Sequence, residues 1–155
     1  MKKLLGAQTL ILLAGTLFAW SRLIPQLRNF RSEYGTLLRF TDCVIPNPLK
    51  TACFFGSLAF LVALIWSLAL LNTPGSVGER RLFWFLVACV LFAASVVVVE
   101  FSEYYHWFGV SSFTVSCSPG TFPLQTPCFL GLIFFVLALG VANIINRINR
   151  RSRTM

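Results

Sequence analysis

Apolar residues in this chain gather into four long runs instead of recurring at helical or alternating spacing. The runs are 17 to 19 residues long, and the third has neither a charge nor an amphipathic period. About 20 apolar residues are needed for a helix to cross a bilayer. The pattern therefore predicts an all-α integral membrane protein with four transmembrane helices, at Leu4–Trp20, Cys53–Leu71, Leu82–Val99 and Cys128–Ile145.

The composition leaves little polar surface to face water. Hydrophobic residues make up 57% of the chain and charged residues 12%, whereas a soluble domain carries about a quarter charged residues. A soluble bundle would also show an amphipathic period in its helices. The expected surroundings are therefore the lipid bilayer.

The chain contains an internal repeat at an offset of 74 to 75 residues. The phrase PLKTACFFG (48–56) returns as PLQTPCFLG (123–131), and Cys43 aligns with Cys117. We interpret the chain as two tandem parallel two-helix repeats, each with a span, an interfacial segment, a cysteine loop and a second span. The predicted units are repeat 1 (1–72), a cytoplasmic connector (73–81), repeat 2 (82–146) and a basic cytoplasmic tail (147–155).

The distribution of Lys and Arg predicts which side each loop faces. Eight of them lie on the side of the termini and the connector, and five lie on the side of the cysteine loops. Because basic loops are retained in the cytoplasm, we expect both termini to be cytoplasmic, in the cytoplasmic (inner) membrane, with the cysteine loops outside. The net charge of +8 is explained by this asymmetry and by attraction to anionic lipids, so no nucleic acid partner is expected.

An interfacial amphipathic helix is predicted after the first span. It starts at Pro25, a favoured first helical residue, and its apolar side chains recur at three- and four-residue spacing, so an apolar stripe can face the acyl chains. The second unit has a matching aromatic segment that carries Glu100 and Glu103. Carboxylates near the end of a span need a partner or water, and Arg22 or Arg28 is the partner that we expect.

Four of the five cysteines belong to the predicted loops and span starts. The repeat favours the disulfides Cys43–Cys53 and Cys117–Cys128, because each unit could then close its own loop. Zinc sites usually space paired ligands two to four residues apart, so no metal site is expected from these longer spacings. The fifth cysteine, Cys89, lies within a span and is interpreted as a small apolar residue.

Cys53 and Cys128 are each predicted to lie in the first turn of a helix. The threonines two residues earlier, Thr51 and Thr126, are good N-caps. Backbone N–H groups and the positive end of a helix stabilise a thiolate, whereas an apolar membrane disfavours one. The sequence leaves open which effect is larger.

Four spans, two outer cysteine pairs and a cysteine at the start of a span make the chain resemble the bacterial disulfide-bond-formation protein B and the vitamin K epoxide reductase-like enzymes. The resemblance is architectural and covers the whole chain loosely; the C-x-x-C of those families is not present here. It implies a thiol-disulfide oxidoreductase that takes electrons from a periplasmic thioredoxin-like protein and passes them to a membrane quinone. By position, Cys53 or Cys128 stands for the span-start cysteine, and Cys43 or Cys117 for its loop partner.

A second interpretation makes the disulfides structural. A closed loop of 11 residues stabilises a fold by roughly 3 kcal/mol in the chain-entropy model. The protein would then be a non-enzymatic membrane scaffold or accessory subunit whose two loops are pinned by disulfides. Transport has no support, because no charged residue lies in the middle of a span.

Overall fold

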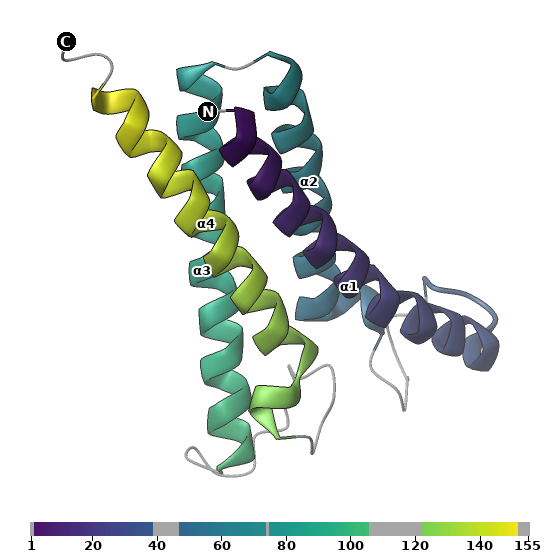
Figure 1. Ribbon diagram of the computed structural model, residues 1–155. Helices are drawn as coiled ribbons and strands as arrows, with labels where there is room; N and C mark the ends of the chain where they lie inside the picture. Colours follow the sequence, from purple (N-terminus) through teal and green to yellow (C-terminus); the bar gives the residue numbers. More distant parts are fainter. Residues whose placement is uncertain (1, 39–46, 74, 106–121, 152–155) are drawn as a thin grey trace.

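The computed structural model is a bundle of four long helices (Figure 1). It describes residues 2–38, 47–73, 75–105 and 122–151, and none of these residues forms a β-strand. Two short 3-10 turns stand directly before the second and fourth helices. The elements in chain order are α1 (Lys2–Tyr34), η1 (Pro48–Lys50), α2 (Ala52–Asn72), α3 (Ser76–Tyr104), η2 (Pro123–Gln125) and α4 (Pro127–Arg151).

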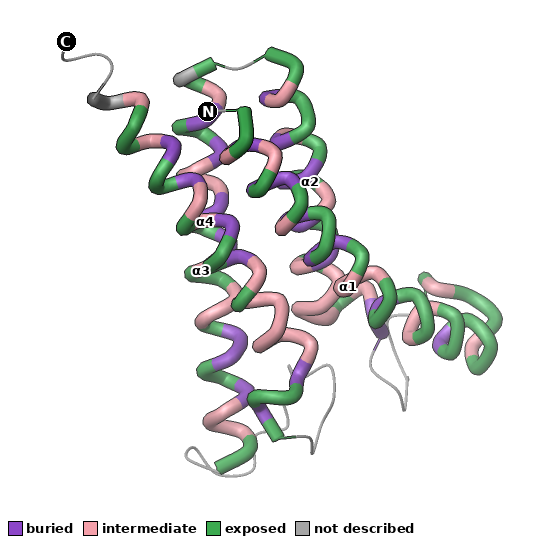
Figure 2. The backbone as a smooth tube through the Cα atoms, viewed as in Figure 1, coloured by how far each residue is buried: buried purple, intermediate pink, exposed green. Residues whose placement is uncertain are grey.

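All four helices are long and apolar enough to cross a membrane, which confirms the four predicted spans. Between 22% and 33% of the most apolar window of each helix is buried inside the bundle. Large apolar side chains cover much of the remainder, and Leu10, Ile65 and Leu91 are among those that are more than half exposed. Figure 2 shows exposed residues along the outer face of every helix. Outer faces of this composition fit contact with lipid, so the chain is a membrane protein.

The helices are arranged as two antiparallel pairs that pack against each other. α1 packs against α2, α3 against α4, and α1 also packs closely against α4. Because the chain crosses the bundle four times, both termini and the turn between α2 and α3 lie at one end (Figure 1). The starts of α2 and α4, with their cysteines, lie at the other end.

Three helices are several residues longer than the sequence predicts, and one of them, α3 (Ser76–Tyr104), begins inside the predicted connector and ends past the predicted span. α1 continues through Pro25 to Tyr34, so the expected interfacial helix is the extension of the first span, and Figure 1 shows its last turns leaving the bundle. Proline removes one helical hydrogen bond, but helices in membranes tolerate it, and the buried ring of Phe30 anchors the segment beyond it. α4 likewise runs to Arg151, past the tail boundary predicted at residue 147.

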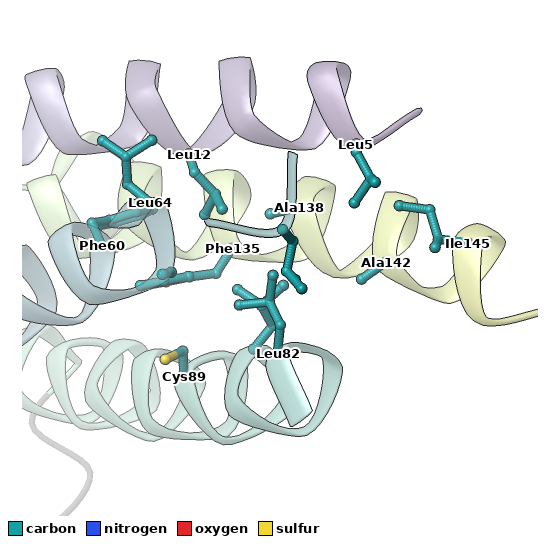
Figure 3. Packing of buried hydrophobic residues seen from close by; sticks show 13 residues of the cluster. Leu5, Leu12, Phe60, Leu64, Leu82, Cys89, Phe135, Ala138, Ala142 and Ile145 are labelled. Atoms are coloured by element: carbon teal, nitrogen blue, oxygen red, sulfur yellow. The ribbon is translucent and has the colours of Figure 1, made fainter. Parts of the chain in front are cut away.

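The core is a layer of apolar side chains contributed by all four helices (Figure 3). The ring of Phe60 from α2 lies parallel to that of Phe135 from α4, with 3.8 Å between ring centroids. Its other side meets the backbone of α1 at Gly15, where a Cβ atom would lie 2.5 Å from Cε1 of Phe60. A polar contact also joins α1 to α2, where the hydroxyls of Thr9 and Ser67 are hydrogen-bonded at 2.8 Å. The missing side chain at Gly15 therefore lets three helices pack around one aromatic ring.

We expect Gly15→Ala to destabilise the bundle, because the added methyl group displaces a ring that is already stacked on its other face. Overpacking of this kind costs about 1–3 kcal/mol, against a gain in helix propensity of about 1 kcal/mol. Thermal unfolding in detergent, followed by loss of the monodisperse size-exclusion peak, measures the difference. Gly6→Ala on the same helix is the control, because a methyl group there meets no atom within 4 Å. Equal unfolding temperatures for the two variants would contradict this description of the core.

Candidate functional site

The two copies of the repeated phrase adopt the same local structure. In each copy a proline opens a 3-10 turn. The threonine that follows the turn donates its N–H to that proline's carbonyl, at 3.2 Å for Thr51 and 3.3 Å for Thr126. Each threonine is the last residue before α2 or α4, as the sequence predicts, so Cys53 and Cys128 are both the second residue of a helix.

The two threonine hydroxyls share one kind of partner and differ in the others. Oγ1 of Thr126, like that of Thr51, lies within hydrogen-bond distance of the carbonyl of the proline that opens its turn, at 2.8 Å. Oγ1 of Thr126 accepts a hydrogen bond from the N–H of Phe129 at 3.3 Å, and the side chain is 2% exposed. Thr51 provides no side-chain cap to α2 in the described part of the chain; its hydroxyl donates to the carbonyl of Pro48 at 2.6 Å. The start of α4 is therefore the more tightly bonded of the two.

The bundle brings the two span-start cysteines together. Sγ of Cys53 lies 3.9 Å from Sγ of Cys128, although the two residues are 75 positions apart in the chain. Cys53 is held in a disulfide, and Cys128 is a thiol. Reacting atoms in a near-attack arrangement are ~3–3.5 Å apart, so a shift of about half an ångström would place Cys128 for attack on the disulfide sulfur of Cys53.

The remaining candidate cysteines, Cys43 and Cys117, lie outside the described residues. Cys128 is a thiol, so the predicted disulfide Cys117–Cys128 is not formed in this structure; the packing of α4 places its sulfur beside Cys53 and Glu100 instead. The pair Cys43–Cys53 stays a prediction, because Cys53 is in a disulfide but Cys43 is outside the described residues. The contact between Cys53 and Cys128 is not predicted from the sequence, because the repeat favours pairing each cysteine within its own unit. In the described residues, no three His, Cys, Asp or Glu side chains gather as a metal site would require.

A buried carboxylate completes this cluster. Glu100 lies one turn before the end of α3 and is 4% exposed. The hydroxyl of Thr126 lies 2.8 Å from its Oε2 and 2.8 Å from the carbonyl oxygen of the proline that opens η2, so these two acceptors share one proton. The thiol of Cys128 also forms a hydrogen bond with this carboxyl group. Arg22, one of its two expected partners, instead places its guanidinium over the ring of Phe18, 5.6 Å from the centroid.

The cysteines lie at the wall of an apolar cavity of about 470 Å³ between the four helices. Small side chains and aromatic rings form most of the lining, and Arg22 is the charged residue in it. The three described cysteines all belong to this wall, and Figure 3 shows one of them, Cys89, on the same side of the core as Phe60 and Phe135. Ligand cavities in proteins usually measure ~300–1,000 Å³ and are mostly apolar, so this one can hold a small apolar ring compound. Its lining includes Phe18, Ala19, Ala59, Phe85, Ala88, Phe92, Ala93, Val96 and Gly131.

Two members of the site are not assigned a role by the sequence pattern alone. Cys89 reads as an ordinary apolar residue of a span, and only the bundle shows that it borders the cavity. Glu100 gives a stronger signal, because an ionisable residue at the edge of a span usually marks a functional site. Its contact with Cys128 could not be predicted, since it depends on how α3 and α4 pack.

The arrangement supports one kind of chemistry more than others. A thiol beside a disulfide sulfur, a carboxylate beside that thiol and an apolar cavity next to both are the parts needed for thiol-disulfide exchange coupled to an apolar electron acceptor. The chain matches no protein-family model, and no curated protein and no solved structure matches it either.

Proposed function

We propose that the protein is a membrane thiol-disulfide oxidoreductase that relays electrons through Cys53 and Cys128 to a membrane quinone. The observation that supports this most directly is the 3.9 Å separation of the two sulfur atoms at the wall of an apolar cavity. A structural disulfide needs no third cysteine beside it. A relay does, because the disulfide must pass from one partner to another.

The relay has three balanced steps. A quinone accepts two electrons and two protons, and Cys53 and Cys128 lose them to form a disulfide with each other. A loop cysteine then attacks Sγ of Cys53, so that the Cys53–Cys128 bond breaks, the loop disulfide forms and Cys128 is released as a thiol. A thioredoxin-like protein with two thiols reduces the loop disulfide in turn and becomes oxidised. The described state, with Cys53 in a disulfide and Cys128 as a thiol, is consistent with the product of the second step.

The cavity fits a quinone head group in size and character. Its volume of about 470 Å³ lies within the usual range of ~300–1,000 Å³ for ligand sites, and its wall of aromatic and small side chains suits a flat apolar ring. Arg22 in the lining offers N–H donors to a carbonyl oxygen. A lipid-soluble acceptor could enter from the bilayer.

The proposed orientation places this site at the outer face. The sequence assigns Lys2, Lys3, Arg80 and Arg81 to the side of the termini, and the bundle has both termini and the α2–α3 turn at one end (Figure 1). Because basic ends are retained in the cytoplasm, we propose cytoplasmic termini in the inner membrane. The cysteines would then lie where disulfides persist and where a periplasmic donor can reach them.

Anaerobic reoxidation of the reduced protein tests this function. The full chain in lipid nanodiscs is reduced, freed of reductant and mixed with ubiquinone-1, and quinone absorbance and protein thiols are followed together. We expect quinone to be consumed with the loss of two thiols per quinone, because disulfide formation is a two-electron process. A variant with Cys53 and Cys128 both changed to serine is the control and should leave the quinone oxidised.

Unchanged quinone and unchanged thiols in the wild-type protein would contradict the proposal. Cys53 would then belong to a structural disulfide, and the scaffold or accessory-subunit interpretation would replace the enzymatic one.

A further inference from the structure

Glu100 is the one described acidic residue that contacts a cysteine of the site. It is 4% exposed, and its carboxyl group takes part in hydrogen bonds with the hydroxyl of Thr126 and the thiol of Cys128. Carboxylates are almost never fully buried unless they are paired, and at the edge of a membrane span they usually have a function. The redox roles given above to Cys53 and Cys128 do not use this group.

The start of α4 holds the carboxylate in place. Thr126 and Cys128 flank the first helical residue, and both contact the same side chain of α3. The positive end of a helix favours a negative charge beside it. The charge is therefore stabilised within reach of the thiol, beside a cavity whose wall is mostly apolar.

The contacts form a line from carboxylate to thiol to disulfide. The S–H of Cys128 donates to Glu100, and Sγ of Cys128 lies 3.9 Å from Sγ of Cys53, which is already disulfide-bonded. A thiol attacks a disulfide only as its thiolate, so its proton must leave before or during attack. The carboxylate that receives its hydrogen bond is placed to take that proton.

The two halves of the chain differ at this position. The repeat aligns Glu100 with Gln26, a neutral residue that cannot accept a proton from a thiol. The carboxylate thus lies beside Cys128, and the aligned position in the first unit is neutral. This difference fits two roles: Cys128 exchanges a proton, and Cys53 exchanges disulfide partners.

Resting on the proposed function, we infer that Glu100 is the proton acceptor and donor of Cys128 during disulfide exchange. When Cys128 attacks, its proton passes to Glu100, a Cys53–Cys128 bond forms, the loop bond of Cys53 breaks, and the loop sulfur leaves as a thiolate. In the reverse direction the loop thiolate attacks Cys53, and Glu100 returns the proton to the departing sulfur of Cys128. No oxidant is consumed in either direction, because one disulfide replaces another.

Other titratable groups lie near this cluster. Among the described residues they are Arg22 from α1, Cys53 from α2 and Cys89 from α3, which line the cavity, and Glu103 one turn further along α3. Glu103 belongs to the same helix end and is half-buried, so Glu103→Gln removes an equal charge close by. It is the matched control for Glu100→Gln.

The test follows disulfide exchange without quinone. The reduced full chain in nanodiscs receives one equivalent of the thiol oxidant diamide, and samples are quenched in acid, alkylated and mapped without reduction. The rate measured is the interconversion of the Cys53–Cys128 form and the form in which Cys53 is bonded to a loop cysteine. We expect Glu100→Gln to slow it about 100-fold or more at neutral pH, Glu100→Asp to recover part of the rate, and Glu103→Gln to match the wild type.

The pH profile separates proton transfer from a structural effect. With the carboxylate present, the rate should level off near neutral pH; in Glu100→Gln it should rise about tenfold per pH unit, as expected when hydroxide must remove the proton. If Glu100→Gln fails to give a monodisperse protein, the pH profile of the wild type and the exchange rate of Glu100→Asp still test whether Glu100 transfers the proton. Exchange that proceeds in the wild type with no plateau, or in Glu100→Gln at the wild-type rate, overturns the role of Glu100 and leaves the proposed function standing. No exchange between Cys53 and Cys128 in the wild type overturns both.

Discussion

Replacing Cys128 with serine should reduce the rate at which the reduced protein consumes quinone to the rate seen in a sample without protein. The sulfur of Cys128 lies 3.9 Å from that of Cys53, and a serine hydroxyl cannot form the disulfide that links the cavity to the loop. Serine differs from cysteine by one atom, so the fold should be retained. The measurement is quinone absorbance under anaerobic conditions, with size-exclusion elution and thermal unfolding of the same sample as the control for folding.

The disulfide of Cys53 should survive this substitution. It should still form with a loop cysteine when diamide is added and should still be reduced by a dithiol, because neither reaction needs Cys128. A Cys128→Ser protein that reoxidises with quinone at the wild-type rate would show that the contact between the two sulfur atoms has no part in electron transfer.

Filling the cavity should raise the KM for quinone and leave the rate of disulfide formation with diamide unchanged. Ala93 lines the cavity from α3, and Ala93→Phe places a ring in the space that the quinone head group requires. If the lost space weakens quinone binding by about 1–3 kcal/mol, the KM for quinone rises roughly 5- to 150-fold. Steady-state reoxidation at varied ubiquinone-1 concentration measures this rise.

The next residue of the same helix provides the control. Ala94 does not line the cavity in the described part of the chain and is half-buried, so Ala94→Phe should keep a KM near that of the wild type. Disulfide formation with diamide, which does not enter through the cavity, should be equal in both variants. An unchanged KM in Ala93→Phe would mean that quinone reacts elsewhere.

The fold follows from the sequence where local pattern decides it. Each apolar run contains enough residues to cross the bilayer, and each becomes a helix because a backbone in lipid must satisfy its own hydrogen bonds. The threonines before α2 and α4 mark the helix starts correctly, although in the described residues the side chain of Thr126 caps its helix and that of Thr51 does not. Pro25 misleads, because a proline that often begins a helix is here inside one.

The site follows from the sequence only in part. The pattern identifies Cys53 and Cys128 as special, since each stands at the start of a span after the same phrase. It does not reveal that they meet, because that depends on packing between distant segments, such as the ring of Phe60 held between Gly15 and Phe135. Nor does it link Glu100 to Cys128, which come from different helices.

The described partners of the carboxylate differ from the two that the sequence suggests. A basic residue is the obvious neighbour for Glu100 near a span end, yet its described partners are a hydroxyl and a thiol from α4. The positive end of that helix also stabilises a carboxylate placed beside it. The sequence pattern does not show this stabilising effect, because it comes from backbone N–H groups and not from a charged side chain.

One measurement tests the central claim, that Cys53 and Cys128 pass a disulfide between them. The fully reduced wild-type protein in nanodiscs is mixed with one equivalent of ubiquinone-1, quenched in acid at intervals from milliseconds to minutes, alkylated and mapped by mass spectrometry without reduction. We expect a peptide pair linked by Cys53–Cys128 to appear first and to decline as Cys53 becomes bonded to a loop cysteine. If only loop disulfides form and the Cys53–Cys128 pair is absent at every time point, the relay does not exist.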